Sequence, residues 1–245
     1  MHPETLSRAV GYAERGGLDH LAVMPDIVMP GLLLMSFATA FLCWGTVLLR
    51  PWRVRNPRSR SSVGIGAFNL VRRSAYQRAG GHAPIRLRPD DDLKLGKLLK
   101  QSGAASDLLL GRGVISVEWY HSVAGLIDGL MKNSFAVVEY HALPMLVGVF
   151  PYLVAGLGPL VVLALGGGDW PARGLAALAI LVQLGVMLRG ARELGAPRRV
   201  ALLYPLVGVL FGWITLRALV VTLWRRGIVW RGTFYPLSEL RKNRI

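Results

Sequence analysis

Three short clusters in the middle of the chain hold residue types that could do chemistry. The acidic triplet Asp90–Asp92 stands directly before a leucine-rich stretch, and Lys132-Asn133 follows further along. A glycine-containing segment, Gly64–Arg73, and the pair Gly80-Gly81 precede both. A carboxylate can take a proton from a reacting hydroxyl, and a lysine offers a positive charge to an anion. Together the clusters predict a site where a carboxylate accepts a proton and a lysine stabilises a nearby negative charge.

Each cluster also has a plain structural interpretation. An acidic triplet before a helix suits the helix N-terminus, where carboxylates accept hydrogen bonds from free N–H groups. Arg72 and Arg73, after a predicted strand, would simply be solvated. Lys132 could pair with Asp128, one helical turn away. The order of the three clusters, ahead of long apolar runs, favours the chemical interpretation over the structural one.

The segments that position these clusters predict a mixed α/β region. Alternation of apolar and polar residues predicts strands, and apolar residues spaced three and four apart predict helices. The expected order is helix 4–15, strand 18–23, apolar run 31–49, strand 64–71, helix 72–78, a helix after the acidic triplet, and one or two strands within 108–119. The run 31–49 could span a bilayer, lie in its surface or pack as a buried helix.

The second half of the chain is apolar enough for a membrane. The chain is 53% hydrophobic with a mean hydropathy of +0.42, which is high for a soluble protein. Residues 120–141 predict an amphipathic helix on a membrane surface, and three apolar runs follow at 143–165, 174–188 and 201–224. The expected domains are 1–120 for the α/β part, 121–142 for the surface helix, 143–224 for the transmembrane region and 225–245 for a basic cytoplasmic tail.

The charge balance narrows the choice of partners. The formal net charge of +15 could attract nucleic acid, an anionic lipid surface or a phosphorylated substrate. The basic residues alternate with long apolar runs, and no basic helix carries interleaved aromatic residues, so we expect no nucleic acid partner. Cys43 is the single cysteine, which excludes a disulfide within the chain and a CxxC metal motif.

The loops between the apolar runs give conflicting orientations. The linker Arg189–Arg199 and the tail from Arg225 are basic, which predicts that both face the cytoplasm, whereas the nearly neutral linker Gly166–Arg173 should face the other side. Three full spans would instead put the tail opposite residues 50–120. Either one run does not cross, the first being the candidate for a broken helix because it contains three prolines, or the charge rule fails.

In their order the motifs resemble the acceptor-side half of family 2 glycosyltransferases with the GT-A fold. In that family G-x-F-x-L-x-R-R and then G-G precede an acidic pair, a hydrophobic helix and a membrane-surface helix with Q-x-x-R-W. This chain has Gly66–Arg73, Gly80-Gly81, Asp91-Asp92 and Gly129–Asn133 in those places. The tail Val229–Tyr235 is similar to a W-R-G-x-x-Y segment of bacterial relatives, which include ceramide glucosyltransferase-like and hopanoid-associated enzymes.

The resemblance implies a fold and a catalytic base. The fold would be an α/β partial GT-A domain followed by an α-helical transmembrane region. Asp92 stands where the family places the base that removes a proton from the acceptor hydroxyl. Asp91 beside it would raise the pKa of that base by like-charge repulsion.

The resemblance also implies residues for the leaving diphosphate. Lys132 occupies the position of the family's arginine, although Gly129 replaces its glutamine and Asn133 its tryptophan. A lysine supplies a point charge rather than the two-pronged contact of an arginine. The further residues of this predicted substrate and diphosphate site are Gly66, Gly80, Gly81, Asn133 and Arg231.

The nucleotide-binding half of such an enzyme is expected outside this sequence. The family holds its sugar nucleotide in a Rossmann-like half, where a D-x-D motif binds the diphosphate through a divalent cation, Mg or Mn. No D-x-D stands at a strand end before residue 60, and His2–Leu6 is similar to the segment that follows it in relatives. We therefore expect that the cation's ligands are absent from this chain and that the chain alone is inactive.

The function implied is inverting transfer of a sugar from a nucleotide sugar to a lipid, a lipid-linked or another membrane-associated acceptor. The partners would be the donor, the acceptor and membrane lipids. The protein would lie in the bacterial inner membrane, with its catalytic part in the cytoplasm. The alternative is a non-catalytic integral membrane protein or assembly subunit, which the apolar runs fit equally well. A transporter fragment is less favoured, because Arg217 is the only charged residue within the three runs.

Overall fold

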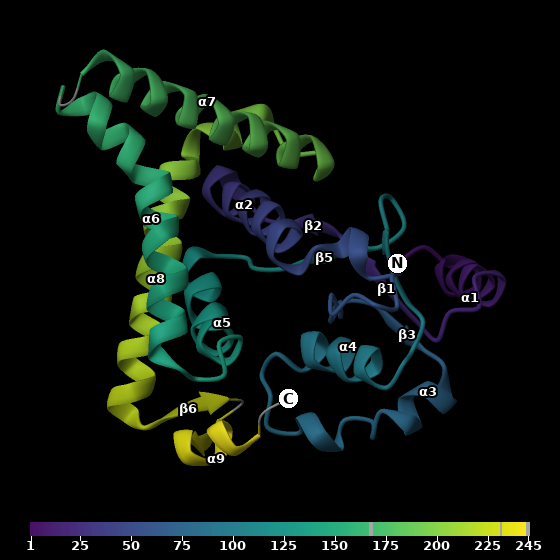
Figure 1. Cartoon of the computed structure of the whole chain (residues 1–245). Coiled ribbons are helices and arrows are strands. Elements are labelled where there is room, and N and C mark those ends of the chain that lie inside the picture. Colours follow the sequence, from purple (N-terminus) through teal and green to yellow (C-terminus); the bar gives the residue numbers. More distant parts are fainter. Residues whose placement is uncertain (167–168, 231, 244–245) are drawn as a thin grey trace. The chain divides into compact units, whose positions relative to one another are not determined.

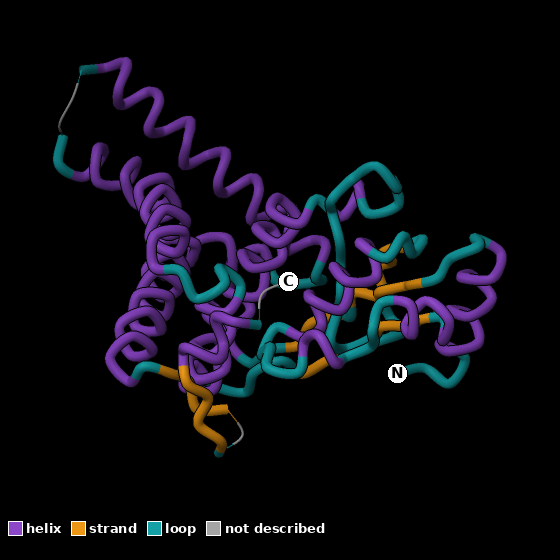
Figure 2. The backbone as a smooth tube through the Cα atoms, turned by 60° about the horizontal axis from the view of Figure 1, so that its bottom comes forward, coloured by secondary structure: helices purple, strands orange, loops and turns teal. Residues whose placement is uncertain are grey.

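The chain folds as two compact units. The computed structural model describes residues 1–166, 169–230 and 232–243. The first unit comprises Met1–Val28, Gly45–Trp119 and Glu239–Ile245, and the second comprises Met29–Trp44 and Tyr120–Ser238. Apart from one hairpin, the strands belong to the first unit and the long helices to the second (Figure 2). The units cut across the segments expected from the sequence, because residues 29–44 leave the α/β part and the last residues join it.

A small mixed sheet forms the centre of the first unit. The strand order is β3 (Asn69–Val71), β1 (His20–Met24) and β4 (Ser106–Leu110), with β1 antiparallel to β3 and parallel to β4. A second parallel pair continues beyond it, β2 (Asp26–Val28) with β5 (Ser116–Glu118). As the middle strand, β1 is buried on both faces, so His20 and Leu21 are equally inaccessible.

Three helices cover this sheet. Helix α1 (Thr5–Arg15) packs Ala9 into a cluster with Leu21 and Val23. Helices α3 (Arg73–Arg78) and α4 (Asp91–Gln101) share a second cluster of buried side chains, made of Ala75, Ile85, Leu95, Leu99 and Ala104. Short 3-10 helices, η1 (Pro51–Arg53) and η2 (Ala83–Ile85), lie in the loops.

Long apolar helices make up most of the second unit. They are α2 (Gly31–Leu49, whose last residues belong to the first unit), α5 (Val123–Ala136), α6 (Ala142–Ala164), α7 (Trp170–Glu193) and α8 (Tyr204–Arg225), with η3 (Arg198–Leu203) before α8. Helices α6 and α8 lie side by side in Figure 1. Gly212 allows this, because a Cβ there would lie 2.8 Å from a methyl group of Leu153. A hairpin of β6 (Gly227–Trp230) and β7 (Thr233–Pro236) leads to α9 (Leu237–Lys242).

Four of these helices are long and apolar enough to cross a membrane. They start at Gly31, Ala142, Trp170 and Arg198, and each has a mean hydropathy of at least 1.8 over its most apolar window. The second apolar run, predicted at 174–188, lies in a longer helix, because α7 extends over 24 residues. The Asp169 carboxylate caps the start of α7 by accepting from the N–H of Ala172.

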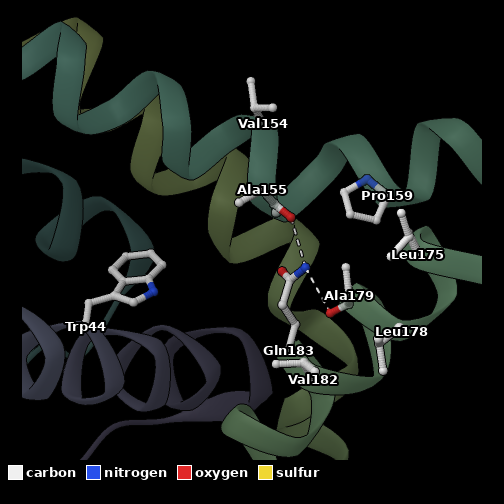
Figure 3. Close-up of a pocket in the computed structure, with 10 residues that line it drawn as sticks. Trp44, Val154, Ala155, Pro159, Leu175, Leu178, Ala179, Val182 and Gln183 are labelled. Carbon is white, nitrogen blue, oxygen red and sulfur yellow. Dashed lines mark hydrogen bonds between the residues drawn. The ribbon is translucent and has the colours of Figure 1, made fainter. Parts of the chain in front are cut away.

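The predicted break in the first apolar run is wrong, because α6 is one continuous helix. Pro144 lies in the first turn, where no N–H is needed. Pro159 has no N–H to offer the carbonyl of Ala155, one turn earlier. Gln183 of α7 compensates, because its side-chain nitrogen donates to that carbonyl oxygen at 2.9 Å and to that of Ala179 at 3.4 Å (Figure 3). A side chain from the neighbouring helix thus donates the hydrogen bond that the proline cannot give to this carbonyl group.

Candidate functional site

The Asp92 carboxylate is anchored at the start of α4 by two backbone groups. Its Oδ2 accepts from the N–H of Gly66 at 2.8 Å, and its Oδ1 accepts from the N–H of Leu93 at 2.8 Å. The side chain is half-buried. Burial raises the pKa of Asp92, the two hydrogen bonds oppose this effect, and the neighbouring charges of Asp91 and Asp90 add to it. The like-charge repulsion expected from the sequence is therefore present, but burial is the larger cause.

Two glycines let the loop before β3 lie directly on α4. A Cβ at Gly64 would lie 1.8 Å from the carbonyl oxygen of Asp92, and a Cβ at Gly96 would lie 1.8 Å from that of Val63. Both distances are impossible for real atoms, so both positions require glycine. This close approach explains why only Asn69–Val71 of the predicted strand 64–71 pairs in the sheet. It also brings the Gly66 N–H to Asp92.

A buried histidine and an asparagine hold the same loop from the sheet side. Asn69 Oδ1 accepts from the N–H of Ile65 at 3.2 Å and lies 3.1 Å from His20 Nε2. Since Oδ1 can only accept, we assign the ring proton of His20 to Nε2, and Nδ1 faces the Ser106 hydroxyl at 3.3 Å. Burial lowers the pKa of His20, against the effect of its bond to Asn69, so the ring stays neutral. This network fixes the loop that carries Gly66.

The three aspartates of the triplet have different surroundings. Asp90 is buried and forms a two-pronged ion pair with Arg88, whose Nε and Nη2 lie 2.9 Å from its two carboxylate oxygens. Asp91 is exposed, and its Oδ1 accepts from the N–H of Asp92 at 3.0 Å. Asp90 is thus neutralised by a wholly buried arginine, which leaves Asp92 and Asp91 as the carboxylates available for chemistry.

The end of the chain closes over this ion pair. The side-chain nitrogen of Asn243 donates to the carbonyl of Pro84 at 2.8 Å, and its backbone carbonyl lies 3.4 Å from Nη1 of Arg88. Leu240 is 1% exposed in the same region. The last residues are therefore part of the structure that leads into the acidic triplet.

The predicted glycine pair terminates a helix. Gly80 and Gly81 have φ of +82° and +59°, and the N–H of Gly81 donates to the carbonyl of Tyr76 at 2.9 Å, which closes α3. The Tyr76 hydroxyl in turn lies 2.6 Å from His82 Nδ1. Among the described contacts, these two glycines shape the turn and do not approach the acidic triplet.

The basic half of the predicted site lies in the second unit. Gly129 packs beneath the ring of Tyr120, because a Cβ at Gly129 would lie 2.4 Å from that ring, and burial raises the pKa of this tyrosine. Lys132 is half-buried, and no ion pair joins it to Asp128 in the described part of the chain, so the simple pairing considered above does not form. Arg231 lies outside the described residues.

Asn133 follows Lys132 and belongs to the substrate and diphosphate site predicted from the sequence. Its side-chain oxygen is buried and has no hydrogen-bond partner among the described residues. A buried amide oxygen without a donor costs free energy. This oxygen has no exposed surface, so its part in the predicted diphosphate site stays an expectation.

A metal centre cannot be assembled from the described residues. No three His, Cys, Asp or Glu side chains within the described ranges come together as a metal site. Asp90 is occupied by Arg88, so the acidic triplet does not act as one cluster. The divalent cation implied by the resemblance stays an expectation.

The larger of the two apolar cavities described in the second unit belongs to the apolar helices. Its volume is about 600 Å³, and Figure 3 shows Gln183 as its polar side chain, turned toward Ala155. Its lining comes from α2, α6 and α7 and consists of Trp44, Val154, Ala155, Gly156, Pro159, Leu175, Leu178, Ala179, Val182 and Gln183. No carboxylate or lysine lines it, so it offers space for apolar groups rather than for acid–base chemistry.

Sequence reasoning missed His20, Arg88 and the role of Asn69. Asn69 and Gly66 fall inside the recognised motif, but the spacing gives no sign that one supports the other. Arg88 stands close to Arg86 in the sequence, and the residue type alone does not show which arginine is buried. Comparison with protein-family models, with curated proteins and with solved structures finds no match to this chain.

Proposed function

We propose that the chain is the acceptor-side and membrane part of an inverting glycosyltransferase, in which Asp92 is the catalytic base. The observation that carries the proposal is a half-buried carboxylate of raised pKa, held by the Gly66 N–H at the start of a helix. It occurs in a chain with four helices apolar enough for a membrane. A carboxylate that only capped its helix would gain nothing from the closely fitted glycine loop laid against it.

The proposed reaction is a single displacement. Asp92 takes the proton of the acceptor hydroxyl as the oxygen attacks the anomeric carbon, the bond from that carbon to the nucleotide diphosphate breaks, and the diphosphate leaves with the electron pair. The resemblance assigns Lys132 the role of countering the charge of the leaving group, with Asn133 next to it in the sequence. Gly66 keeps the Asp92 carboxylate oriented throughout.

The acceptor class follows from the apolar surface. Helices α6 and α7 expose large apolar side chains, and their most apolar windows are only 6% and 22% buried within the protein. A lipid or lipid-linked acceptor is dissolved in such surroundings, so it would reach the site from the membrane. We place the protein in the bacterial inner membrane with Asp92 in the cytoplasm, as its basic loops favour.

Contacts within the first unit support an even number of membrane crossings. Strand β1 pairs with β3 and β4, although α2 separates β1 from β3 in the sequence, so both ends of α2 must lie on one side. Asn243 bonds to Pro84, so the end of the chain lies there too. The chain that leaves after Trp119 would then return to the same side, with no more than two of α6, α7 and α8 crossing.

We propose that α6 and α7 are the crossing pair. The basic linker Arg189–Arg199 then shares the side of the basic tail, as the charge rule requires. Helices α2 and α8 are also the more buried candidates, with 33% and 44% of their apolar windows inside the protein. In a Cys43→Ser background, Gly166→Cys should react with a membrane-impermeant maleimide from outside intact cells, whereas Gly195→Cys and Lys242→Cys should not. Labelling of Gly195→Cys from outside would refute this pair.

The activity test follows label from nucleotide sugars into lipid. Membranes would contain the chain produced from its whole gene, with any upstream in-frame coding sequence, and would receive a panel of radiolabelled nucleotide sugars. Asp92→Asn should lower transfer by about 10²- to 10⁴-fold, the usual contribution of a general base. Asp91→Asn, at the exposed neighbour, is the matched control and should cost much less. Normal transfer by Asp92→Asn would leave Asp92 with a structural role only and favour a non-catalytic membrane protein.

The pH dependence of transfer should carry the signature of this carboxylate. The base works in its ionised form, and burial raises its pKa, so activity should fall on the acid side at a higher pH than an ordinary aspartate would give. Asp92→Glu, if it retains transfer, should move that acid limb. A limb that stays in place would assign the titration to another group.

A further inference from the structure

The exposed face of α8 combines apolar residues with one arginine. Large apolar side chains recur on this face at helical spacing and are between 40% and 80% exposed: Val209, Trp213, Leu216, Val220, Leu223 and Trp224. Arg217 lies on the same face and is exposed. This face has the composition of a surface covered by lipid, apart from a charge that lipid chains do not tolerate.

The guanidinium of Arg217 turns back along the helix. Its Cζ lies 5.3 Å from the ring centroid of Trp213, one turn earlier, and its Nη1 lies 3.0 Å from the sulfur of Met131 on α5. The group thus points back toward the start of α8 and not toward Arg225 at its end. Its position is fixed by an indole face and a thioether.

The charge of Arg217 has no counter-charge among the residues that the structure describes. Within the described ranges no carboxylate forms an ion pair with it. A thioether sulfur is a weak acceptor, so most of its five N–H groups remain free for a ligand. A guanidinium with free donors and no carboxylate beside it favours the binding of an anion.

We propose that Arg217, Trp213 and Met131 form a binding site for the phosphate of a membrane phospholipid. Arginine matches phosphate oxygens with paired hydrogen bonds, tryptophan prefers the level of the headgroups, and the apolar residues of α8 offer a surface for the acyl chains. The site lies wholly in the second unit and does not depend on the proposed transfer reaction. A soluble diphosphate would lack the acyl chains that this surface accommodates.

The test measures lipid binding by the purified full chain in a neutral detergent. Dioleoyl phosphatidylglycerol is titrated, and bound lipid per chain is counted by native mass spectrometry, with dioleoylglycerol as the same chains without phosphate. We expect saturable binding of phosphatidylglycerol alone, weakened roughly tenfold by Arg217→Gln as a lost charged hydrogen bond predicts. Arg217→Lys should bind with intermediate affinity, because it retains the charge without the two-pronged geometry.

The control is Arg225→Gln, which removes an exposed arginine at the end of the same helix. It should bind phosphatidylglycerol like the unmodified chain. Equal losses in Arg217→Gln and Arg225→Gln would show that only net charge matters and would overturn the site. Equal binding of dioleoylglycerol, or displacement of the lipid by inorganic pyrophosphate, would overturn it as well. Circular dichroism of Arg217→Gln and Arg217→Lys verifies that both variants retain their helices.

Discussion

The two units differ in the kinds of polar group that they bury. In the first unit Arg88 is paired with Asp90, and His20 with Asn69, so that buried charges and rings have defined partners. In the second unit the hydroxyls of Thr215 and Tyr204 are buried without a partner among the described residues. The bond from Gln183 to Ala155 serves the helix backbone and no other side chain.

The contrast shows what each unit has to specify. The first must hold one carboxylate, Asp92, in one orientation. It does so with paired charges and with backbone groups that hydrogen-bond to this carboxylate. The second needs an apolar surface and intact helices, which many side chains can provide. Removing a polar group or disturbing a close backbone contact should therefore cost more in the first unit than in the second, and three substitutions test this difference.

The largest effect on stability should come from Arg88→Ala. It removes the two-pronged partner of the buried Asp90 carboxylate and leaves only Lys94, whose Nζ lies 3.9 Å away. Removing one partner of a buried ion pair typically costs about 3–5 kcal/mol. The melting temperature in detergent should fall sharply, and unfolding should begin at lower urea concentration. Arg86→Ala, two residues earlier and exposed, is the control and should change little. Equal effects of the two would mean that the buried pair is unimportant.

A smaller loss is expected for Gly64→Ala. The added methyl group would meet the carbonyl oxygen of Asp92 and force the loop away from α4, at roughly 1–3 kcal/mol for such overpacking. Gly174→Ala in α7 is the matched change in the second unit, where nothing lies within 4 Å of the new Cβ. It should keep or slightly raise the melting temperature, because alanine favours a helix. A tolerated Gly64→Ala would contradict the close approach described here.

The smallest loss is expected for Gln183→Leu. This change removes the donor to the Ala155 carbonyl but keeps an apolar surface, and hydrogen bonds between membrane helices are worth about 0.6 kcal/mol on average. Thermal unfolding in detergent should reveal a small decrease, with Gln101→Leu at the exposed last residue of α4 as the control. A loss as large as that of Arg88→Ala would remove the contrast between the units.

The sequence predicted the elements better than their contacts. The sequence predicted a helix at 4–15 and an apolar run at 31–49, and the structure has helices over Thr5–Arg15 and Gly31–Leu49. The strand predicted for 64–71 is only Asn69–Val71, because packing of the preceding loop on α4 overrides its alternating pattern. The prolines predicted a break in α6 that Gln183 prevents from another helix. Contacts between distant segments decide such cases, and local patterns do not encode them.

The candidate site shows the same division. Residue type and order singled out Asp92, but the Gly66 N–H, the role of Asn69 and the pairing of Asp90 arise only when distant segments meet. The pKa of Asp92 illustrates the point, since adjacent charges can be counted in a sequence and burial cannot. Asn243 could not be anticipated either, because it lies 155 residues from its neighbour Arg88.

The position of Asn243 has a consequence for biosynthesis. A ribosome adds about 5–20 residues per second, so roughly ten to thirty seconds separate the emergence of Arg88 from that of its last neighbour. During this interval the apolar helices enter the bilayer while the α/β unit still lacks its closing segment. Completion of the fold near the aspartates is thereby delayed until insertion is over, and a polypeptide stalled or clipped before its final turn would leave a buried arginine open to water.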